Sequence, residues 1–150
     1  MGFFSALHAS ASALTAQRLR MDVISENIAN VNTTRTEDGT PYRRKTVIFE
    51  AMNGNTPFST YLSNASKKLI GSRSSGGVRV TAIVEDQTPF KSVYDPGHPD
   101  ADENGMVQMP NVDVVTEMVN LISASRAYEA NVTSIDTTKS MALKALEIGR

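Results

Sequence analysis

Apolar residues recur every seven positions at both ends of this 150-residue chain, which is the spacing of a coiled-coil helix. In the N-terminal segment one series is Leu7, Leu14, Met21 and Ile28, and the partner series is Phe3, Ile24 and Val31. Ser10 and Gln17 are polar interruptions. A helix from about Phe4 to Val31 would be roughly 42 Å long. A helix so long, with so narrow an apolar stripe, is predicted to pack against a partner helix.

The C-terminal segment carries a longer repeat of the same kind. Its positions alternate four and three residues apart, and they are Val114, Met118, Leu121, Ser125, Tyr128, Val132, Ile135, Lys139, Ala142 and Leu146. Pro110 and Asn111 precede the repeat, Glu117 lies in its first turns and Lys144 near its end, as the helix dipole favours. We expect a helix from about Val112 to Ile148 that pairs with the N-terminal one.

The segment between the two helices is rich in strand-forming residues. Strands are predicted at Tyr42–Ala51, Gly77–Asp86 and Pro89–Asp95, and the run "GSRSSGG" before the second is a loop signal. The expected fold class is α+β, with long N- and C-terminal helices forming a coiled coil and a small antiparallel β-rich middle domain. The predicted division is 1–36 for the N-terminal assembly helix and its exit, 37–110 for the middle domain and 111–150 for the C-terminal assembly helix.

Composition and charge exclude several classes of function. A formal net charge of −1 provides no basic field to neutralise phosphates, so no nucleic acid is expected as a partner. The most basic run, Arg43 to Lys45, is expected to form the solvated face of a strand. The chain has no cysteine, which excludes disulfides, thiolate nucleophiles and Cys-ligated zinc.

The N-terminus does not have the pattern of a cleaved secretory signal. The first basic residue is Arg18, and His8 and Gln17 interrupt the apolar residues. No apolar run reaches the length of a transmembrane helix, and no direct lipid binding is expected. If the protein leaves the cytoplasm, we expect it to do so without cleavage of a conventional signal.

Two loop patterns suggest ion or acid–base chemistry, and neither is complete. "DADENG" (Asp100 to Gly105) matches the opening of an EF-hand loop, but the twelfth loop position is Asn111 in place of the bidentate Glu. We therefore favour a solvated acidic turn, and the sequence leaves open whether this loop binds any ion. His98 lies among acidic residues, but with two His in the chain a His-rich site cannot be assembled.

The helical hydroxyl residues do not form a nucleophile motif either. There is no G-x-S-x-G elbow, and "TTKS" (Thr137 to Ser140) lacks a glycine-rich loop that could hold phosphate. Small hydroxyl residues on long helices more simply permit close helix approach. We expect no catalytic residues and no cofactor, and we expect the function to depend on association with other proteins.

Asparagines accompany the apolar residues at the end of the first repeat, in "ISENIANVNTTRT". Asn27 and Asn32 are expected to flank the seam unburied and Asn30 to point away, so that their amides bond the backbones of neighbouring subunits or cap the exit of the helix. The expected assembly interface combines the seam with such asparagines: Leu7, Leu14, Met21, Ile24, Asn27, Ile28, Asn30, Val31, Asn32, Val114, Met118, Leu121, Ser125, Tyr128, Asn131, Val132, Ile135 and Leu146.

These segments resemble the axial proteins of the bacterial flagellum, the rod, hook and hook-associated family. The resemblance rests on "SENIANVNT" in the first helix, a β-rich middle and "MVNLISASRAYEANV" in the last helix. Within that family, "GTPYRRK" (Gly39 to Lys45) and "DPGHPDADENGMVQMPNVDVVTEMVNLI" (Asp95 to Ile122) are most similar to proximal rod members. The resemblance covers both ends and most of the chain.

The resemblance implies a structural subunit of the proximal rod, not an enzyme. Such a subunit self-assembles through its terminal helices into the drive shaft that crosses the periplasm and transmits torque from motor to hook. Implied partners are copies of itself, other proximal rod subunits, the distal rod protein, the basal rod-to-membrane-ring adaptor and the flagellar type III export apparatus. The alternatives are another flagellar axial protein or a soluble coiled-coil oligomerisation adaptor.

Overall fold

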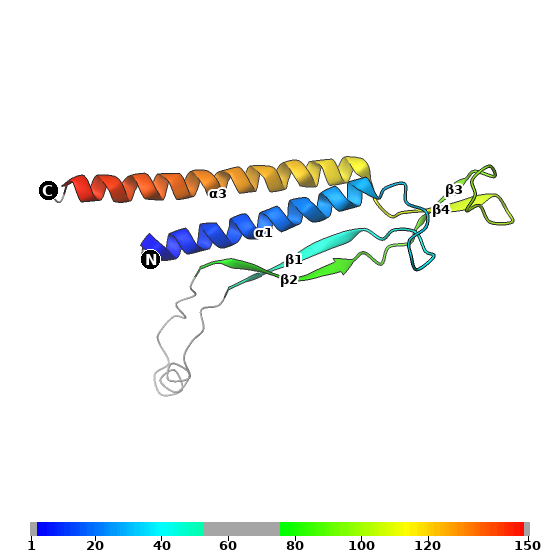
Figure 1. Ribbon diagram of the computed structural model, residues 1–150, viewed down its shortest axis with the longest axis horizontal. Coiled ribbons are helices and arrows are strands. Elements are labelled where there is room, and N and C mark those ends of the chain that lie inside the picture. The colour runs from blue at the N-terminus through cyan, green and yellow to red at the C-terminus, as the bar shows by residue number, and fades with distance from the viewer. Residues whose placement is uncertain (1–2, 53–75, 149–150) are drawn as a thin grey trace, which may run out of the picture.

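A computed structural model of the chain describes residues 3–52 and 76–148. Helix α1 spans Phe3–Ala29 and helix α3 spans Val114–Ile148, so both predicted helices are present with bounds that differ by at most two residues. The two helices run antiparallel and pack side by side (Figure 1). The start of α1 and the end of α3 lie at one end of this pair. The chain that connects the two helices leaves α1 and enters α3 at the other end, the connecting end.

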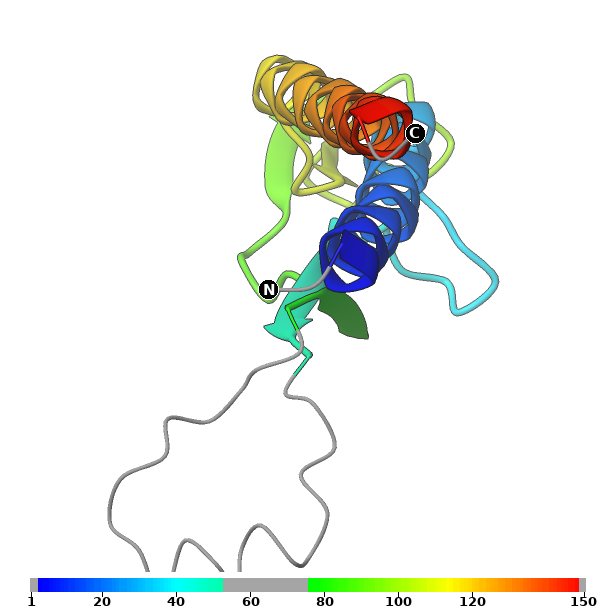
Figure 2. The ribbon, with the colours of Figure 1, turned by 90° about the vertical axis from the view of Figure 1, so that its left-hand side faces the viewer.

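The first sheet is a hairpin that covers α1 on the side away from α3. Strand β1 (Lys45–Ala51) pairs antiparallel with β2 (Val78–Glu85), and Figure 2 shows α1 between this hairpin and α3. Val47 and Phe49 alternate with exposed neighbours along β1, as expected for a strand with one face on a helix. The register shifts between Ile48 and Phe49, where Thr81 of β2 is an extra residue and its hydroxyl donates to the Ile48 carbonyl.

The second sheet lies beyond the connecting end of the helix pair (Figure 1). Strand β3 (Lys91–Tyr94) pairs antiparallel with β4 (Met106–Met109), and its loop contains the acidic turn. The third predicted strand is therefore present but belongs to a separate hairpin with β4, a strand that the sequence analysis missed. β4 is four residues long and carries Gln108, so its apolar alternation is too short to stand out.

The α+β class predicted from the sequence is confirmed: two long terminal helices pack together, with small two-stranded antiparallel sheets between them in sequence. Most of the predicted "GSRSSGG" loop lies outside the described residues. The buried apolar residues gather on α1, around Tyr42, and at the end of β4 and the start of α3: Ala16, Val23, Ile24, Tyr42, Val107, Val112 and Ala124.

Candidate functional site

A buried network of hydrogen bonds centres on Asn27, in the last turns of α1. Its side chain is 0% exposed. The Asn27 amide nitrogen donates to the Lys45 carbonyl and to Oε2 of Glu117, both at 2.9 Å. Its oxygen accepts from the Lys45 backbone N–H at 2.9 Å and from the Tyr42 hydroxyl at 3.0 Å. These four bonds use the full capacity of the amide, so Asn27 joins α1, β1 and α3.

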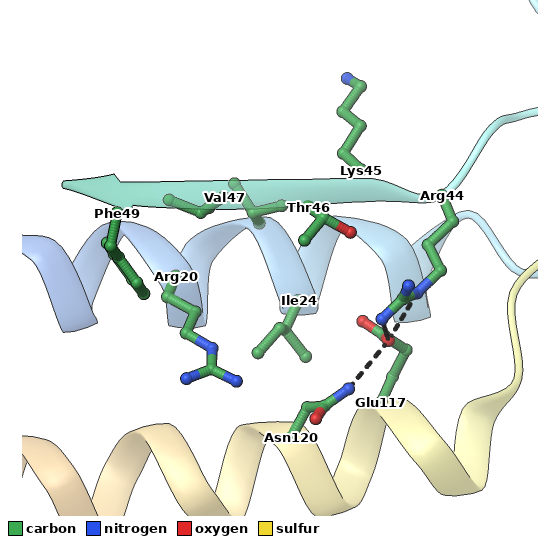
Figure 3. Close-up of a pocket in the computed structure, with 10 residues that line it drawn as sticks. Arg20, Ile24, Arg44, Lys45, Thr46, Val47, Phe49, Glu117 and Asn120 are labelled. Atoms are coloured by element: carbon green, nitrogen blue, oxygen red, sulfur yellow. Dashed lines mark hydrogen bonds and ion pairs between the residues drawn. The ribbon is translucent and has the colours of Figure 1, made fainter. Parts of the chain in front are cut away.

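Glu117 brings a buried carboxylate from the first turn of α3 to the same point. It is 1% exposed, and its Oε1 accepts from Nε of Arg44 at 2.9 Å, with the Arg44 Nη2 at 2.8 Å. Asn120 donates to the same oxygen at 3.3 Å, and Figure 3 shows these contacts. Because Glu117 has a cation and two amide donors around it, its charge is compensated inside the protein.

Arg44 also connects this pair to the residues after β2. Its Nη1 lies 3.3 Å from Oδ2 of Asp86. Burial opposes the charge of Arg44, but hydrogen bonds and charges of Glu117 and then Asp86 outweigh it and raise the Arg44 pKa. The Asp86 pKa is lowered, chiefly because the Thr88 backbone N–H and hydroxyl donate to its carboxylate. The charged forms of Arg44 and Asp86 are therefore both favoured in the folded chain.

Asn111, three residues before α3 begins, is hydrogen-bonded to the same network. Its oxygen accepts from the Arg44 backbone N–H at 2.8 Å. Its amide nitrogen donates to the Asp86 carbonyl at 3.0 Å and to the Thr88 hydroxyl at 2.9 Å. The name "polar junction" is used below for this connected set: Asn27, Tyr42, Arg44, Asp86, Asn111 and Glu117.

The basic run from Arg43 to Lys45 is not the solvated face that the sequence predicted. Arg44 enters the polar junction. The Arg43 guanidinium lies 4.4 Å from the centre of the Phe90 ring, and the Lys45 ammonium lies 2.6 Å from Oε1 of Glu26. All three side chains are half-buried. Each packs against a residue from another part of the chain, which sequence patterning does not reveal.

The predicted seam residues of α1 from Leu7 onward are half-buried or buried. Leu7, Leu14, Met21 and Ile28 lie on the side of α1 turned away from Ser12 and Leu19, which line an apolar cleft with β2. Ile24 is 5% exposed and Val31, just after the helix, is half-buried. The Gln17 side-chain oxygen is buried and has no hydrogen-bond partner among the described residues.

On α3 the predicted seam residues fall into a half-buried group and an exposed group. Leu121, Tyr128 and Ile135 are half-buried, as are Val114, Ser125 and Ala142. Met118 is 53% exposed, Val132 38% and Leu146 72%. The most buried residues of the helix are Glu117 and Ala124, one position before the predicted Met118 and Ser125. Since α1 is the element against which α3 packs, the α3 face that meets α1 is centred one position away from the predicted seam.

This rotation leaves an apolar stripe on the first half of α3 largely exposed. The stripe, called the outer face below, consists of Val115, Met118, Val119 and Ile122, each more than half exposed. Helical spacing places these residues on one side, opposite the Glu117–Ala124 contact with α1. An exposed apolar patch of this kind typically marks a protein–protein interface.

The asparagines fall into three different environments. Asn27 is buried, against the expectation that it flanks the seam. The Asn30 amide donates to the Glu26 carbonyl at 3.0 Å and its oxygen accepts from the Thr33 hydroxyl, so Asn30 does cap the end of α1. Asn32 is exposed and Asn131 is half-buried, where its amide donates to the Ala127 carbonyl at 2.7 Å.

The acidic loop is the turn of the β3–β4 hairpin. The Asp100 carboxylate accepts a 2.8 Å hydrogen bond from the Thr34 hydroxyl, and His98 accepts at Nδ1 from the Asp100 backbone N–H. Asp102 uses its backbone to close the hairpin with Met106. In residues 3–52 and 76–148 there is no cluster of three His, Asp or Glu side chains that could hold a metal ion, and no helix long and apolar enough to cross a membrane.

Apart from Asn27, the polar junction residues were absent from the predicted interface, because hydrophobic periodicity does not detect them. Glu117, Ala124 and Asn131 are spaced seven apart, but they are polar or small, so the heptad that meets α1 is weaker in apolar content than its neighbour. Buried Glu is rare unless it is paired, so only its partner Arg44 could have indicated its position. That partner lies 73 positions away in sequence.

Comparison with known proteins identifies relatives over the whole chain. Residues 7–35 match the family profile described as flagella basal body rod protein, and residues 103–148 match the one described as flagellar basal body rod FlgEFG protein C-terminal. The flagellar basal-body rod protein FlgC of Borreliella burgdorferi is 51% identical over 99% of this chain and 98% of its own length. The proteins of that name from Bacillus subtilis and Salmonella typhimurium are 50% and 42% identical, each over 100% of both chains.

Proposed function

The chain belongs to the FlgC family of flagellar basal-body rod proteins, and from this premise we propose that it self-assembles through its terminal helices into the proximal rod. The family is structural and not enzymatic. The rod is the expected location, as part of the drive shaft that crosses the periplasm and transmits torque from motor to hook. The alternative of an unrelated coiled-coil adaptor does not account for 42–51% sequence identity to rod proteins over the full length of the chain.

The observation that best supports assembly through the helices is the outer face of α3. Val115, Val119 and Ile122 are 69%, 61% and 54% exposed, on a helix whose opposite side already contacts α1. Burial of such side chains against another subunit would gain roughly 25 cal/mol per Å² of apolar area. A neighbouring rod subunit is therefore the proposed occupant of the outer face.

The polar junction supports the mechanical part of the proposal. A shaft under torque must resist sliding of its helices past one another. Asn27 of α1 and Glu117 of α3 bond each other, and each also bonds the segment around Arg44 and Lys45, so a shift of one turn would break several bonds at once. We propose that the junction fixes the register of α1, α3 and β1 in each subunit.

The wider set of partners is part of the same proposal. They are copies of itself, other proximal rod subunits, the distal rod protein, the basal adaptor to the membrane ring and the flagellar type III export apparatus. The predicted interface residues also remain proposals. Of these, Met118 and Val132 are exposed and available to a neighbouring subunit, whereas Leu121 and Tyr128 are half-buried within the subunit.

The test replaces two exposed apolar side chains of the outer face, Val119→Gln with Ile122→Gln. Stability of the isolated chain should change by less than about 0.5 kcal/mol, because surface substitutions away from packed features are nearly neutral. Cells with this variant as their only copy should lose assembled rods and motility. The matched control is Thr133→Gln with Thr137→Gln, two exposed polar positions farther along α3.

Both measurements are needed to interpret the result. Motility assays and electron microscopy of isolated basal bodies report assembly, and urea unfolding of the purified chain reports folding. Motile cells with normal rods from the outer-face variant would show that this face does not hold the assembly.

A further inference from the structure

The β3–β4 hairpin, residues 91–109, stands apart from the rest of the molecule and is called the arm below. Neither of its strands packs against a helix or the first sheet in the described part of the chain, and Figure 1 shows it beyond the connecting end of the helix pair. Two paired strands of four residues are too short to be stable by themselves in water. The arm therefore depends on contacts with the segments at its base.

Polar contacts attach the arm to the loop that leaves α1 and to the residues before α3. The Lys91 ammonium donates to the Val112 carbonyl at 3.1 Å, and the Thr34 hydroxyl donates to the Asp100 carboxylate at 2.8 Å. Val107 of β4 is 2% exposed, which adds an apolar anchor. These contacts fix the arm through β4 and the two ends of the hairpin, and they leave β3 uncovered.

Strand β3 presents an exposed apolar surface. All four of its residues are exposed, and the apolar ones are Val93 at 48% and Tyr94 at 69%. The Tyr94 ring lies against the backbone of Gly105, where an added Cβ would be 3.0 Å from a ring carbon. The ring is therefore held in place while it is exposed. A large aromatic group that is already ordered loses little freedom on binding, and such groups are frequent anchors of protein–protein interfaces.

The turn of the arm carries an excess of negative charge. Asp95, Asp100, Asp102 and Glu103 lie in it, and residues 92–109 contain no Lys or Arg. Within the described ranges, Asp100 is the one of these four that pairs with a cation, Arg35, at 3.9 Å. Three carboxylates are therefore uncompensated, and a positively charged partner would complement them.

A polar cleft beside the turn has space for a side chain of such a partner. It lies between the arm and residues 34–41, with a volume of about 470 Å³, and Asp100, Asp102 and Gln108 line it from the arm. Carboxylate and amide oxygens are suitable acceptors for an ammonium or guanidinium group. Arg35 also lines the cleft, but its ion pair is with Asp100, so Asp102 is left to a partner.

A second copy of this chain does not offer a matching basic surface within residues 3–52 and 76–148. Arg43 to Lys45 is the one run of adjacent cations in those residues. This run is half-buried and already engaged with acidic and aromatic groups of its own subunit. The charge of the arm therefore favours a partner of different sequence that has a basic segment.

We propose that the arm is a docking element for a neighbouring rod protein of different sequence. Apolar side chains of that protein pack on Val93 and Tyr94, and its Lys or Arg side chains face Asp102 and Glu103. This contact rests on the proposed rod function and adds a second surface to the outer face of α3. Because the arm extends past the connecting end of the helix pair, the neighbour meets the subunit at that end.

Reversal of charge on the arm tests the electrostatic part of the contact. Asp102→Lys with Glu103→Lys should reduce the number of assembled rods at least about tenfold, because like charges then meet. Both side chains are exposed, so the urea midpoint of the purified chain should not fall. The matched control, Glu37→Lys with Asp38→Lys, makes the same change of charge at exposed positions outside the arm and should leave rods and motility normal.

Normal rods from the arm variant would overturn the proposal. Equal loss of rods from the arm variant and the control would also overturn it, because the effect would then belong to net charge and not to the arm.

Photo-cross-linking identifies the neighbour independently of charge. In this variant p-benzoylphenylalanine replaces Tyr94 and keeps an aromatic ring at that position. On illumination its ketone takes a hydrogen atom from a nearby C–H group and the two carbons join, so the ketone becomes an alcohol. Mass spectrometry of isolated basal bodies should find this chain joined to a different rod protein, at a segment rich in Lys or Arg. The same group in place of Thr133, exposed on α3, should not give that product.

The outcomes separate this contact from the rod function itself. Products that join only copies of this chain, or a segment without basic residues, would overturn the proposed partner. Rods that assemble normally and give no product at position 94 would overturn the docking. Both results leave the chain in basal bodies, so the rod function would stand. Absence of the unmodified chain from purified basal bodies would instead refute the rod function.

Discussion

The Asn27 amide at the end of α1 donates a 2.9 Å hydrogen bond to the buried Glu117 carboxylate at the start of α3, 90 residues away in sequence. Through its other three bonds, Asn27 also holds Tyr42 and both backbone groups of Lys45. One amide thus fixes how the two helices and the first strand meet. The predictions below begin with this contact.

Replacement of Asn27 by Ala should lower the free energy of unfolding by about 2–4 kcal/mol, because several buried polar groups lose their partner at once. Urea unfolding of the purified chain, followed by circular dichroism, measures the change. Asn32→Ala is the matched control, since Asn32 is exposed, and it should stay within about 0.5 kcal/mol. Equal effects of the two changes would contradict the central role of Asn27.

Glu117→Met alone should cost about 3–5 kcal/mol, because Arg44, Asn27 and Asn120 all lose the buried carboxylate and Arg44 keeps only Asp86 as a partner. Arg44→Met alone should also destabilise, by leaving Glu117 charged and buried. The double replacement by Met removes both charges and should be less destabilising than Glu117→Met. Comparison of the three variants by urea unfolding decides this, and a double variant that loses the sum of the single losses would refute coupling.

Tyr42 should make stability fall at alkaline pH. Burial, and then the nearby Glu26 carboxylate, raise the Tyr42 pKa from 10.0 to about 12. A raised pKa in the folded state means that stability is complete below pH 10 and is lost as the pH rises through about 12, because the unfolded chain releases the proton first.

The measurement compares unfolding free energy between pH 9 and 12 in the natural chain and in Tyr42→Phe. The variant should lack this part of the alkaline loss, whereas Tyr94→Phe, at a tyrosine 69% exposed, should retain it. Parallel curves for the natural chain and Tyr42→Phe would show that this phenol does not contribute to the pH dependence.

Gly105 should tolerate alanine less well than Gly39, although both have positive φ, 72° and 74°. A Cβ at Gly105 would lie 3.0 Å from a Tyr94 ring carbon and 3.2 Å from Cβ of Pro96, whereas none lies within 4 Å at Gly39. Each change costs about 1–2 kcal/mol for the left-handed backbone. Gly105→Ala should cost more than Gly39→Ala by thermal unfolding, and equal losses would mean that the Tyr94 ring moves aside freely.

Gln17→Met should stabilise the chain. The buried Gln17 oxygen has no hydrogen-bond partner in the part of the chain that the structure describes, and a lost buried polar group of this kind is worth about 1–3 kcal/mol. Met has similar length and no polar atom to satisfy. A higher urea midpoint is the expected result, and Gln108→Met, at an exposed position of β4, should leave the midpoint unchanged.

The sequence determined the two long helices and the α+β class, because heptad spacing and strand composition act over a few neighbouring residues. It also indicated the cap at the end of α1, which Asn30 forms with Glu26 four residues before it. Tertiary structure alone decided which face of α3 meets α1, and it selected Glu117 and Ala124 over the more apolar Met118. It decided this because Glu117 gains Arg44 and Asn27 only at that rotation, and neither partner is close to it in sequence. The same long-range pairing buried Asn27, since hydrogen bonds between distant segments have no local periodicity.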